Sequence, residues 1–525
     1  MTTIPPFAAG SYTASRNTSQ LLALKSQLSD LTNQLSSGLT SQTYGGLGGA
    51  RTTALSAQAS ISALNGYSSV IDTAQTRAKL GTTSLSQVVS VASATNSTLQ
   101  NGLQSTSLDT QAAKSTALNN LNAALDALNQ SDGSVYLFGG KKGSTQPVAD
   151  AGAILYGTSD GTKTLDGLQT IVQQQVDADI GPNGDGRVTQ TYVANSTTIS
   201  LAEGPSARVS AQNGGAFGFQ LTDVKASGTA IGVTPASPSG QATLSVNGQP
   251  VQGDTMTVKL TLPDNTTTTI TLTAAAATAP TSSTTFTIGA TPSDTAKNLN
   301  DKLSAAIKNA ASTTLSANAT PRATTDFFAA STDANTTPKR VYADATTGGP
   351  TYLLAKAAAG TPQKQSVVWY QGESGLDSTA RASQTYQVGS SATVQLGARA
   401  NEASIQSVLS GLATVAFGMP TAGSANSAQA YQAVAAAATP MLAAYNTGNS
   451  VQNIVTDFSL ASARMSSAQT ANAAQQSTLQ DTVDGIEQAS TEEVATKLLD
   501  LQTRLQASYQ ITSSLSKLSL VNYLS

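Results

Sequence analysis

The C-terminal stretch, residues 490–525, constrains the fold of this chain more than any other. One row of residues recurs there at spacings of four and three: Val494, Leu498, Leu501, Leu505, Ser508, Thr512, Leu515 and Leu518. Such a row forms a narrow stripe along a helix, which is typical of a coiled coil. Ser490 and Glu493 have the spacing of a capping box, in which a hydroxyl and a carboxylate bind free N–H groups at a helix start. We therefore expect a C-terminal helix whose stripe packs against a partner.

The best partner lies at the other end of the chain. A helix expected at 18–37, ended by Gly38, carries a row with the same spacing: Leu21, Leu24, Leu28, Leu31 and Leu35. Either the two ends close one globular core, or they pack against each other and against further copies of the chain. Charged residues make up 11% of the sequence, against roughly 25% in ordinary soluble domains. Because interface cores are also depleted in charge, the composition favours the second interpretation.

Composition also excludes several classes of function. The 525 residues include no cysteine and no histidine, which removes disulfides, thiolate or histidine metal sites, and histidine-based catalysis. We therefore expect no enzyme, no cofactor and no bound metal. A net charge of −3 argues against nucleic acid as a partner. The sequence contains no long apolar run and no ordinary secretion signal, so neither membrane insertion nor a cleaved leader is expected.

Apolar residues at helical spacing dominate both ends of the sequence, and the middle is rich in Thr, Gly and Pro. Apolar residues recur every seven positions from Ala57 to Leu99, and further helices are expected at 109–130, 405–412, 428–445 and 451–479. One central helix, capped by Ser293, would bury Leu299, Leu303 and Ile307. The expected strands are 191–193, 197–201, 256–262, 268–272, 284–288 and 367–370.

These observations predict an α+β fold in which long coiled-coil helices from both termini form the core and β-rich domains are inserted in the middle. The expected domain map has four parts. Residues 1–45 and 485–525 form a terminal helical coiled coil, and 46–150 with 395–484 form a long-helix core domain. Residues 151–204 with 346–394 form its β-rich part, and 205–345 form an outer, surface-exposed insertion.

Four segments resemble one known family. They are LKSQLSDLTNQLSSGLTSQTYGGLG (24–48), VYLFGGKKGSTQPV (135–148), WYQGESGLDSTAR (369–381) and LLDLQTRLQASYQITSSLSKLSLVNYL (498–524). On these residues the chain is similar to bacterial flagellin and its relative, the flagellar hook–filament junction protein. The resemblance covers about 1–145 and 365–525. It implies that the terminal helices pair as the inner tube of a helical polymer, that the long helices surround them, and that the insertions face solvent.

The resemblance also implies a function: a structural subunit that polymerises into the extracellular flagellar filament for motility, exported without a cleaved signal. Its partners would be further copies of itself, neighbouring flagellar axial proteins, an export chaperone and the cap. The Thr-rich insertion and low charge favour the filament subunit, whereas the Leu-Gln-Ala-Ser-Tyr ending and the Phe-Gly-Gly turn favour the junction protein. A secreted coiled-coil adhesin is the third interpretation. The polymerisation seam would be the two rows of leucines with Val494.

Two motifs suggest other chemistry but lack the residues for it. The segment 177–188 resembles a calcium loop, yet Gly181 stands at the first ligand position and Tyr192 at the twelfth, where a bidentate Glu is required. The Trp369–Glu373 block resembles part of some carbohydrate esterases, but a serine nucleophile there would have no histidine to activate it. We interpret both as turns.

Overall fold

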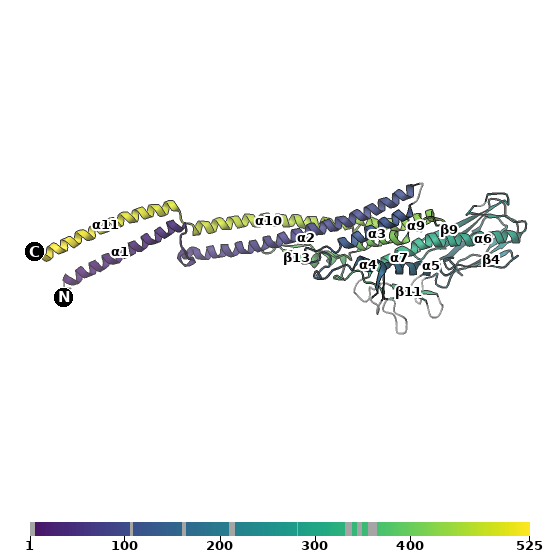
Figure 1. Cartoon of the computed structure of the whole chain (residues 1–525), viewed down its shortest axis with the longest axis horizontal. Coiled ribbons are helices and arrows are strands. Elements are labelled where there is room, and N and C mark those ends of the chain that lie inside the picture. Colours follow the sequence, from purple (N-terminus) through teal and green to yellow (C-terminus); the bar gives the residue numbers. More distant parts are fainter. Residues whose placement is uncertain are drawn as a thin grey trace. The chain divides into compact units, whose positions relative to one another are not determined.

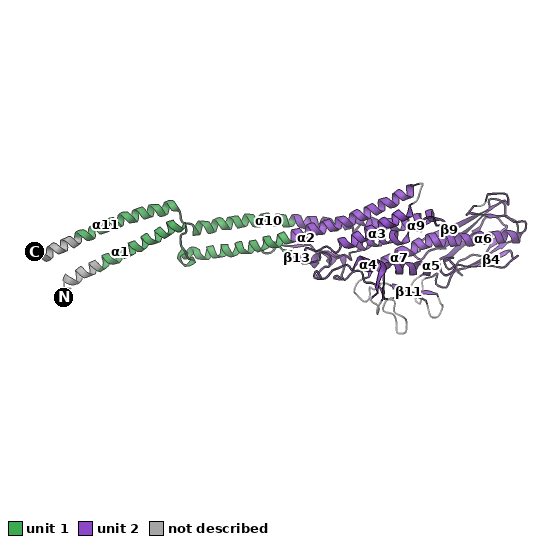
Figure 2. Ribbon diagram, in the orientation of Figure 1, with its two compact units in different colours: residues 1–73, 387–393, 464–525 green, residues 74–386, 394–463 purple. Residues whose placement is uncertain are grey.

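The computed structural model describes residues 6–105, 109–159, 164–208, 216–280, 282–330, 339–343, 349–354 and 365–524. Helices and sheets both occur, which confirms the α+β class. Contacts divide the chain into two compact units (Figure 1 and Figure 2). The first contains residues 1–73, 387–393 and 464–525, and the second contains 74–386 and 394–463. The helices α2 (Arg51–Gln104) and α10 (Val451–Glu487) each contribute to both units.

The first unit is almost entirely helical. It contains α1 (Pro6–Ser37), the short 3-10 helix η1 (Tyr44–Ala50), the beginning of α2, the end of α10, and α11 (Thr491–Leu524). α1 packs against α11. The α2 and α10 segments lie side by side, since Gln476 donates to Asn65 (3.0 Å) and Gln469 to Asp72 (2.9 Å).

The helical core of the second unit is organised around α8 (Ala403–Gly418), whose residues are buried nearly all round. A helix that is apolar on every side must lie inside a bundle. α8 packs against α3 (Thr110–Ala127), α7 (Ser316–Ala329) and α9 (Ser427–Leu442). Asp109 begins α3 by accepting the Ala112 N–H at 2.8 Å, as an N-cap does.

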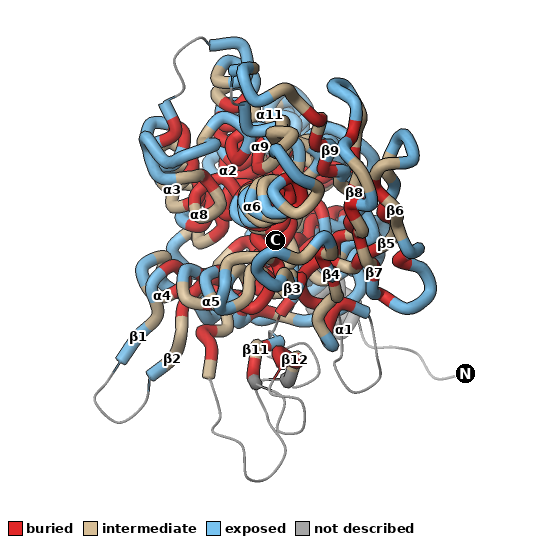
Figure 3. Tube along the Cα trace, turned by 90° about the vertical axis from the view of Figure 1, so that its right-hand side faces the viewer, coloured by how far each residue is buried: buried red, intermediate tan, exposed pale blue. Residues whose placement is uncertain are grey.

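A separate hydrophobic core extends from Val188 to Leu315, and we call residues 188–315 the β-module. One sheet has the order β3 (Thr189–Tyr192), β4 (Thr198–Ala202), β7 (Gln241–Val246), β6 (Ile231–Val233). The other has the order β10 (Thr285–Thr287), β9 (Thr267–Ala275), β8 (Thr255–Thr261), β5 (Gln220–Ala226). Pairing is antiparallel except between β10 and β9. α6 (Pro292–Ala310) contacts strands of both sheets and buries Leu299, Leu303 and Ile307. Figure 3 colours the buried positions of the chain red, among them positions on the strands of this module.

The expected boundaries of the outer insertion, 205–345, differ from those of the β-module. A boundary at 205 falls between β4 and its hydrogen-bonded neighbour β7. A boundary at 345 assigns α7 to the insertion, yet α7 packs against α8 of the helical core. The contacts therefore place both boundaries of the inserted unit earlier in the chain than composition did, at about 188 and 315, because composition does not show which strands pair.

One continuous helical stretch joins the β-module to the helical core. α6 continues through a π-helical turn (Ala311–Leu315) directly into α7. The other connection is a turn that contains Gly181, Gly184 and Gly186, all with positive φ. Both connections meet in space, since a Cβ on Gly186 would lie 3.1 Å from Leu315 Cδ2.

Smaller elements complete the second unit. They are α4 (Ala151–Tyr156), α5 (Leu168–Ile180), the pair β1 (Gly157–Ser159) and β2 (Thr164–Asp166), the pair β11 (Lys339–Ala343) and β12 (Pro350–Leu354), and the short 3-10 helices Asp377–Thr379, Arg381–Ser383 and Ala443–Tyr445. β13 (Thr385–Gln387) and β14 (Thr393–Gln395) form a further pair at residues that the two units share.

Two local expectations were wrong. The strand expected at 367–370 is only an isolated bridge between Val148 and Tyr370. The cap of α6 is Thr291 rather than Ser293, because Thr291 and Asp294 form a complete capping box.

The two central segments of the resemblance lie side by side. Val148 bridges Tyr370, the Gln371 N–H donates to Pro147 O at 2.8 Å, and the Glu373 N–H donates to Gly139 O at 3.0 Å. The segment 135–148 is therefore held by the chain that returns from the sheets.

Candidate assembly surface

The α1–α11 pair contains the two predicted leucine rows. On α11, Val494, Leu501 and Leu505 are buried, and Leu498 is half-buried. On α1 the corresponding residues Leu21, Leu24, Leu28 and Leu31 are only half-buried. The side chains of Leu515 and Leu518 lie outside the described residues. The pair alone therefore covers the α11 row well and the α1 row in part.

Leu35 departs from its row: it is 42% exposed, whereas Gln34 is half-buried. An α-helix has 3.6 residues per turn, so a row with a 3.5-residue repeat drifts across the contact face. Gln34 also donates to Thr40 O at 2.9 Å, which fixes its side chain toward the turn that follows α1. Leu35 is thereby left outside the helix–helix contact.

The two helices are joined at their inner ends by a short backbone ladder. The Thr40 N–H donates to Glu487 O at 2.7 Å and the Ala489 N–H donates to Gly38 O at 2.9 Å. Gly38 has φ +70°, a left-handed conformation that suits glycine after a helix end. This ladder holds the start of α11 beside the end of α1.

The predicted capping box at Ser490 is formed only in half. Ser490 Oγ accepts the Glu493 N–H at 3.3 Å, but the Glu493 carboxylate pairs with Lys497 at 2.6 Å instead of the Ser490 backbone. The hydrogen bond from Lys497 lowers the pKa of Glu493. Two turns further, Arg504 pairs with Asp500 at 2.9 Å. The positive and negative charges of these pairs cancel within α11, so the pairs present no net charge to a neighbouring molecule.

Further large apolar side chains remain exposed on the pair. Leu22 of α1 and Leu499 of α11 are each 64% exposed, and Tyr509 and Ile511 are exposed as well. A large exposed apolar patch commonly marks an interaction surface, so we take these four side chains as candidate contacts between subunits. Sequence analysis did not identify these four residues, because it assigned a single stripe to each helix.

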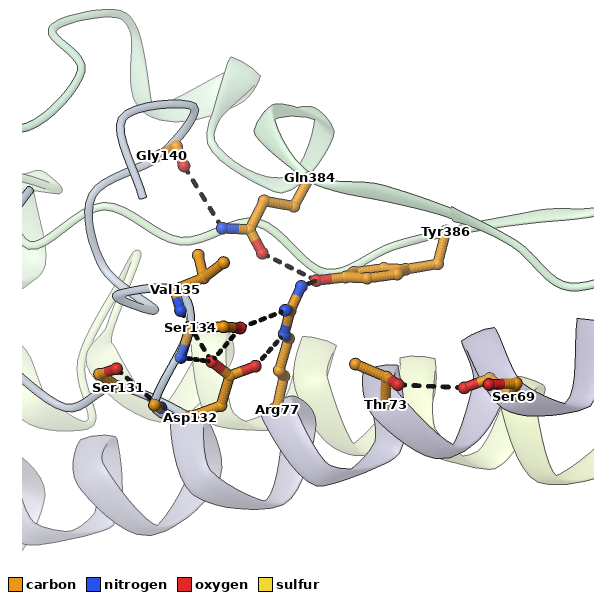
Figure 4. Close-up of polar contacts among 11 residues, drawn as sticks. Ser69, Thr73, Arg77, Ser131, Asp132, Ser134, Val135, Gly140, Gln384 and Tyr386 are labelled. Carbon is orange, nitrogen blue, oxygen red and sulfur yellow. Dashed lines mark hydrogen bonds and ion pairs between the residues drawn. The ribbon is translucent and has the colours of Figure 1, made fainter. Parts of the chain in front are cut away.

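A polar cluster in the second unit fixes the middle of α2. Arg77 donates to Asp132 at 2.6 Å, to the Tyr386 hydroxyl at 3.0 Å and to Ser134 at 3.3 Å (Figure 4). Tyr386 in turn donates to Gln384 at 3.0 Å, whose amide donates to Gly140 O. The cluster connects α2 to the turn after α3 and to β13. It joins residues far apart in sequence, so no local pattern could have predicted it.

The Arg77–Asp132 pair predicts an acid-sensitive fold. Burial by itself would raise the pKa of Asp132, but hydrogen bonds from Arg77 and Ser134 outweigh it and hold the pKa well below its usual range. A depressed folded-state pKa stabilises the fold above the ordinary carboxyl pKa of about 4, and that stabilisation is lost as the pH falls below it. We expect wild type to lose about 1.5–3 kcal/mol more than Asp132→Asn on acidification, the range for hydrogen bonds to charged groups.

Urea unfolding of both proteins at a series of pH values from about 5 to about 2 measures this difference, because the stabilisation begins to be lost as the pH falls below the ordinary carboxyl pKa of about 4. Asp301→Asn is the matched control, since the Asp301 carboxylate is exposed and its ion-pair partner Lys297 is exposed as well. Parallel pH curves for wild type and Asp132→Asn would contradict the assignment.

The residues of the two discounted motifs have structural partners. Asp179 of the calcium-like loop is fully buried against Arg322 and Gln175. Within the described part of the chain, no group of three acidic residues could hold a metal. Trp369 is buried and donates to Phe328 O at 2.8 Å, and Tyr370 donates to Glu373 O at 3.1 Å.

No protein-family model matches this chain, and no curated protein matches it either. None of the described helices is both long and apolar enough to cross a membrane.

Proposed function

We propose that the chain is the structural subunit of an extracellular helical polymer, the flagellin of a bacterial flagellar filament. The observation that carries the proposal is the α1–α11 pair. Its α1 row is only half-buried, and Leu22, Leu499, Tyr509 and Ile511 remain exposed. Further copies of the same pair, packed around it, would remove this apolar surface from water. In the polymer, the two termini would form the inner coiled coil and the β-module would face solvent.

The composition supports the same function. Charge is low across the whole chain, and the charges on α11 are neutralised by pairing along the helix. A subunit that is surrounded by copies of itself meets its own charges at every contact. Neutral, small side chains avoid the repulsion that like charges would produce there.

The hook–filament junction protein of the same family is the second candidate. The resemblance of the Phe-Gly-Gly turn to that protein favours this candidate. In this chain the turn is part of the fold, since Phe138 is fully buried and its carbonyl accepts the Ala400 N–H at 2.9 Å. A junction protein forms a short ring, so filament length separates the two candidates. Electron microscopy of the purified chain, with and without seeds, should show long filaments if the first proposal is correct.

A single exposed residue offers a sharper test of the assembly surface. Leu499→Asp is expected to prevent filament formation, because burying a charge without a partner in an apolar contact is costly. Gln502→Asp adds the same charge at an exposed position three residues away, on the same helix face, and is the control that separates added charge from loss of the Leu499 side chain. Neither change should alter monomer stability by more than about 0.5 kcal/mol, as is usual for surface substitutions.

Sedimentation and electron microscopy measure assembly, and thermal unfolding measures the monomer. If Leu499→Asp forms filaments as wild type does, the exposed face of α11 is not a contact between subunits.

A further inference from the structure

A closed ring of hydrogen bonds lies in the helical core, near the point where the chain enters the β-module. Asp179, in the last turn of α5, is fully buried. Its Oδ2 accepts from Arg322 of α7 and from the Gln175 amide, the latter at 3.1 Å. The Tyr352 hydroxyl of β12 completes the ring, since it donates to Gln175 Oε1 at 2.7 Å and accepts from Arg322 at 3.3 Å. Each of these four side chains, which we call the Asp179 ring, is thus held by two others.

The β-module contacts the Asp179 ring through residues 217–219. The Gly218 N–H donates at 3.2 Å to Asp179 Oδ1, the oxygen that the ring does not use. The Phe217 side chain is fully buried, and its ring centroid lies 4.5 Å from that of Tyr352, a separation at which aromatic pairs attract each other. One carboxylate therefore binds the helical core with one oxygen and the β-module with the other.

The backbone of 217–219 also lies directly on the turn that connects α5 to the β-module. Gly218 has φ +75°, and a Cβ there would lie 2.5 Å from Gly186 O. The Phe219 N–H donates to the same Gly186 O at 2.8 Å. A glycine suits position 218 because it has no side chain and adopts a positive φ without strain.

Asp179 carries the charge on which the ring depends. It pairs with Arg322, and the charge of Arg187, whose Nε donates to Ala178 O in the connecting turn, acts on it as well. Hydrogen bonds to an ionised group are roughly twice as strong as neutral ones. An asparagine at this position would have no charge and only one acceptor oxygen, so it could not serve both bodies in the same way.

A buried ion pair of this kind contributes little to stability, because the loss of hydration offsets the attraction. A fully bonded buried network does favour one arrangement over others. The helical connection from α6 to α7 contains the π-helical turn Ala311–Leu315, and helices commonly bend at such turns. Arg322 and Tyr352 also line a cavity of about 870 Å³, which gives both side chains space to move once Asp179 no longer holds them.

We propose that the Asp179 ring is a lock that holds the β-module in one orientation on the helical core. Without the Asp179 charge, the module turns about the π-helical turn while both bodies stay folded. The alternative is that the helix from α6 to α7 fixes the orientation by itself. The lock uses no residue of α1 or α11 and is independent of the proposed polymer.

Double electron–electron resonance between two spin labels tests the proposal. The chain has no cysteine, so Val251→Cys in the β-module and Tyr156→Cys in the helical core, both at exposed positions, would carry the only labels. We expect one narrow distance in the otherwise wild-type chain and loss of that narrow peak after Asp179→Asn. Asp177→Asn removes a charge at an exposed position on the same helix and should leave the peak unchanged.

Cleavage by trypsin after Arg187 gives a second readout, since this bond lies in the connecting turn. When opening is fast relative to cleavage, the rate follows the population of the open form. Loss of hydrogen bonds to a charged group should raise that population, and with it the initial cleavage rate, at least roughly tenfold. Mass spectrometry of the fragments 1–187 and 188–525 measures this rate in Asp179→Asn, Asp177→Asn and wild type.

Gly218→Ala keeps every side chain of the Asp179 ring and displaces only the segment of the β-module, so it decides the question even where Asp179→Asn does not fold. It should also broaden the distance, while Trp369 emission, which reports on the helical core, stays that of wild type. A distance in Gly218→Ala as narrow as in wild type would overturn the proposal. So would a broad distance in wild type, or equal effects of Asp177→Asn and Asp179→Asn.

Discussion

Leu505→Pro is expected to abolish filament assembly while the second unit stays folded. Leu505 is buried in the α1–α11 contact near the middle of α11. Proline there removes a backbone donor and clashes with the preceding turn, which costs about 3 kcal/mol or more. Loss of a buried leucine adds roughly 2–5 kcal/mol where the site is packed. Both costs fall on the first unit, to which α11 belongs.

The alternative interpretation makes the opposite prediction for stability. If the termini closed an ordinary core, a loss of several kcal/mol would lower the melting temperature of the molecule by roughly ten degrees or more. Under the proposed function, unfolding of the second unit should nearly coincide in wild type and variant, and only wild type should assemble. Leu505→Ala is the graded control, since it removes side-chain packing but keeps the helix backbone intact. A large shift in melting temperature, with or without filaments, would mean that the ends stabilise the whole molecule.

The second large effect concerns two deletions that differ in their boundaries. Removal of the β-module, residues 188–315, with a short Gly/Ser linker should leave the helical core folded and assembly intact. The module has its own hydrophobic core, and its ends are adjacent near Gly186 and Leu315. Closing a short loop between neighbouring points costs little entropy.

Removal of residues 205–345 should instead unfold the helical core. That deletion leaves β3 and β4 without β7, and a two-stranded sheet alone is marginally stable at best. It also removes α7, which buries Phe327 and Phe328 and contacts α8. Loss of two buried phenylalanines costs roughly 3–5 kcal/mol each, which is comparable with the whole stability of a domain.

Trp369 reports on both deletions, because it is the only tryptophan of the chain and is fully buried against Phe328. Its emission should stay that of a buried indole without 188–315 and should shift to that of an exposed one without 205–345. Electron microscopy then compares assembly. If both deletions behave alike, the boundaries of the β-module are wrong.

Local sequence patterns predicted many of the helices and strands. Several errors fall where contacts between segments far apart in the sequence determine the structure. α6 buries the expected Leu299, Leu303 and Ile307, because a 3.6-residue period is visible in the sequence. β5 was missed, since a bulge between Leu221 and Asp223 interrupts its alternation. β7 was missed although Ala242, Leu244 and Val246 alternate as a half-buried strand does. The sequence alone could therefore have predicted β7.

The candidate sites show the same limit more strongly. The α11 row could be predicted from the sequence because it repeats along one helix. The exposed face of the α1–α11 pair depends on how two segments pack, and its residues include Leu22 and Leu499. The cavity of the second unit is lined by residues of α5, α7, α9, β11 and β12. No spacing in the sequence brings these elements together, so the cavity could be found only in three dimensions.

Under the proposed function, the unbroken helical stretch from α6 to α7 would have a mechanical consequence. Flow past a rotating filament would exert drag on the β-module. Two flexible connections would let the module turn against the helical core. Here one of the two connections is a helix that is packed at both of its ends, since α6 packs against the sheets and α7 packs against α8. That helix would therefore carry the torque into the bundle around α8, and the π-helical turn at Ala311–Leu315 is the irregular point along it.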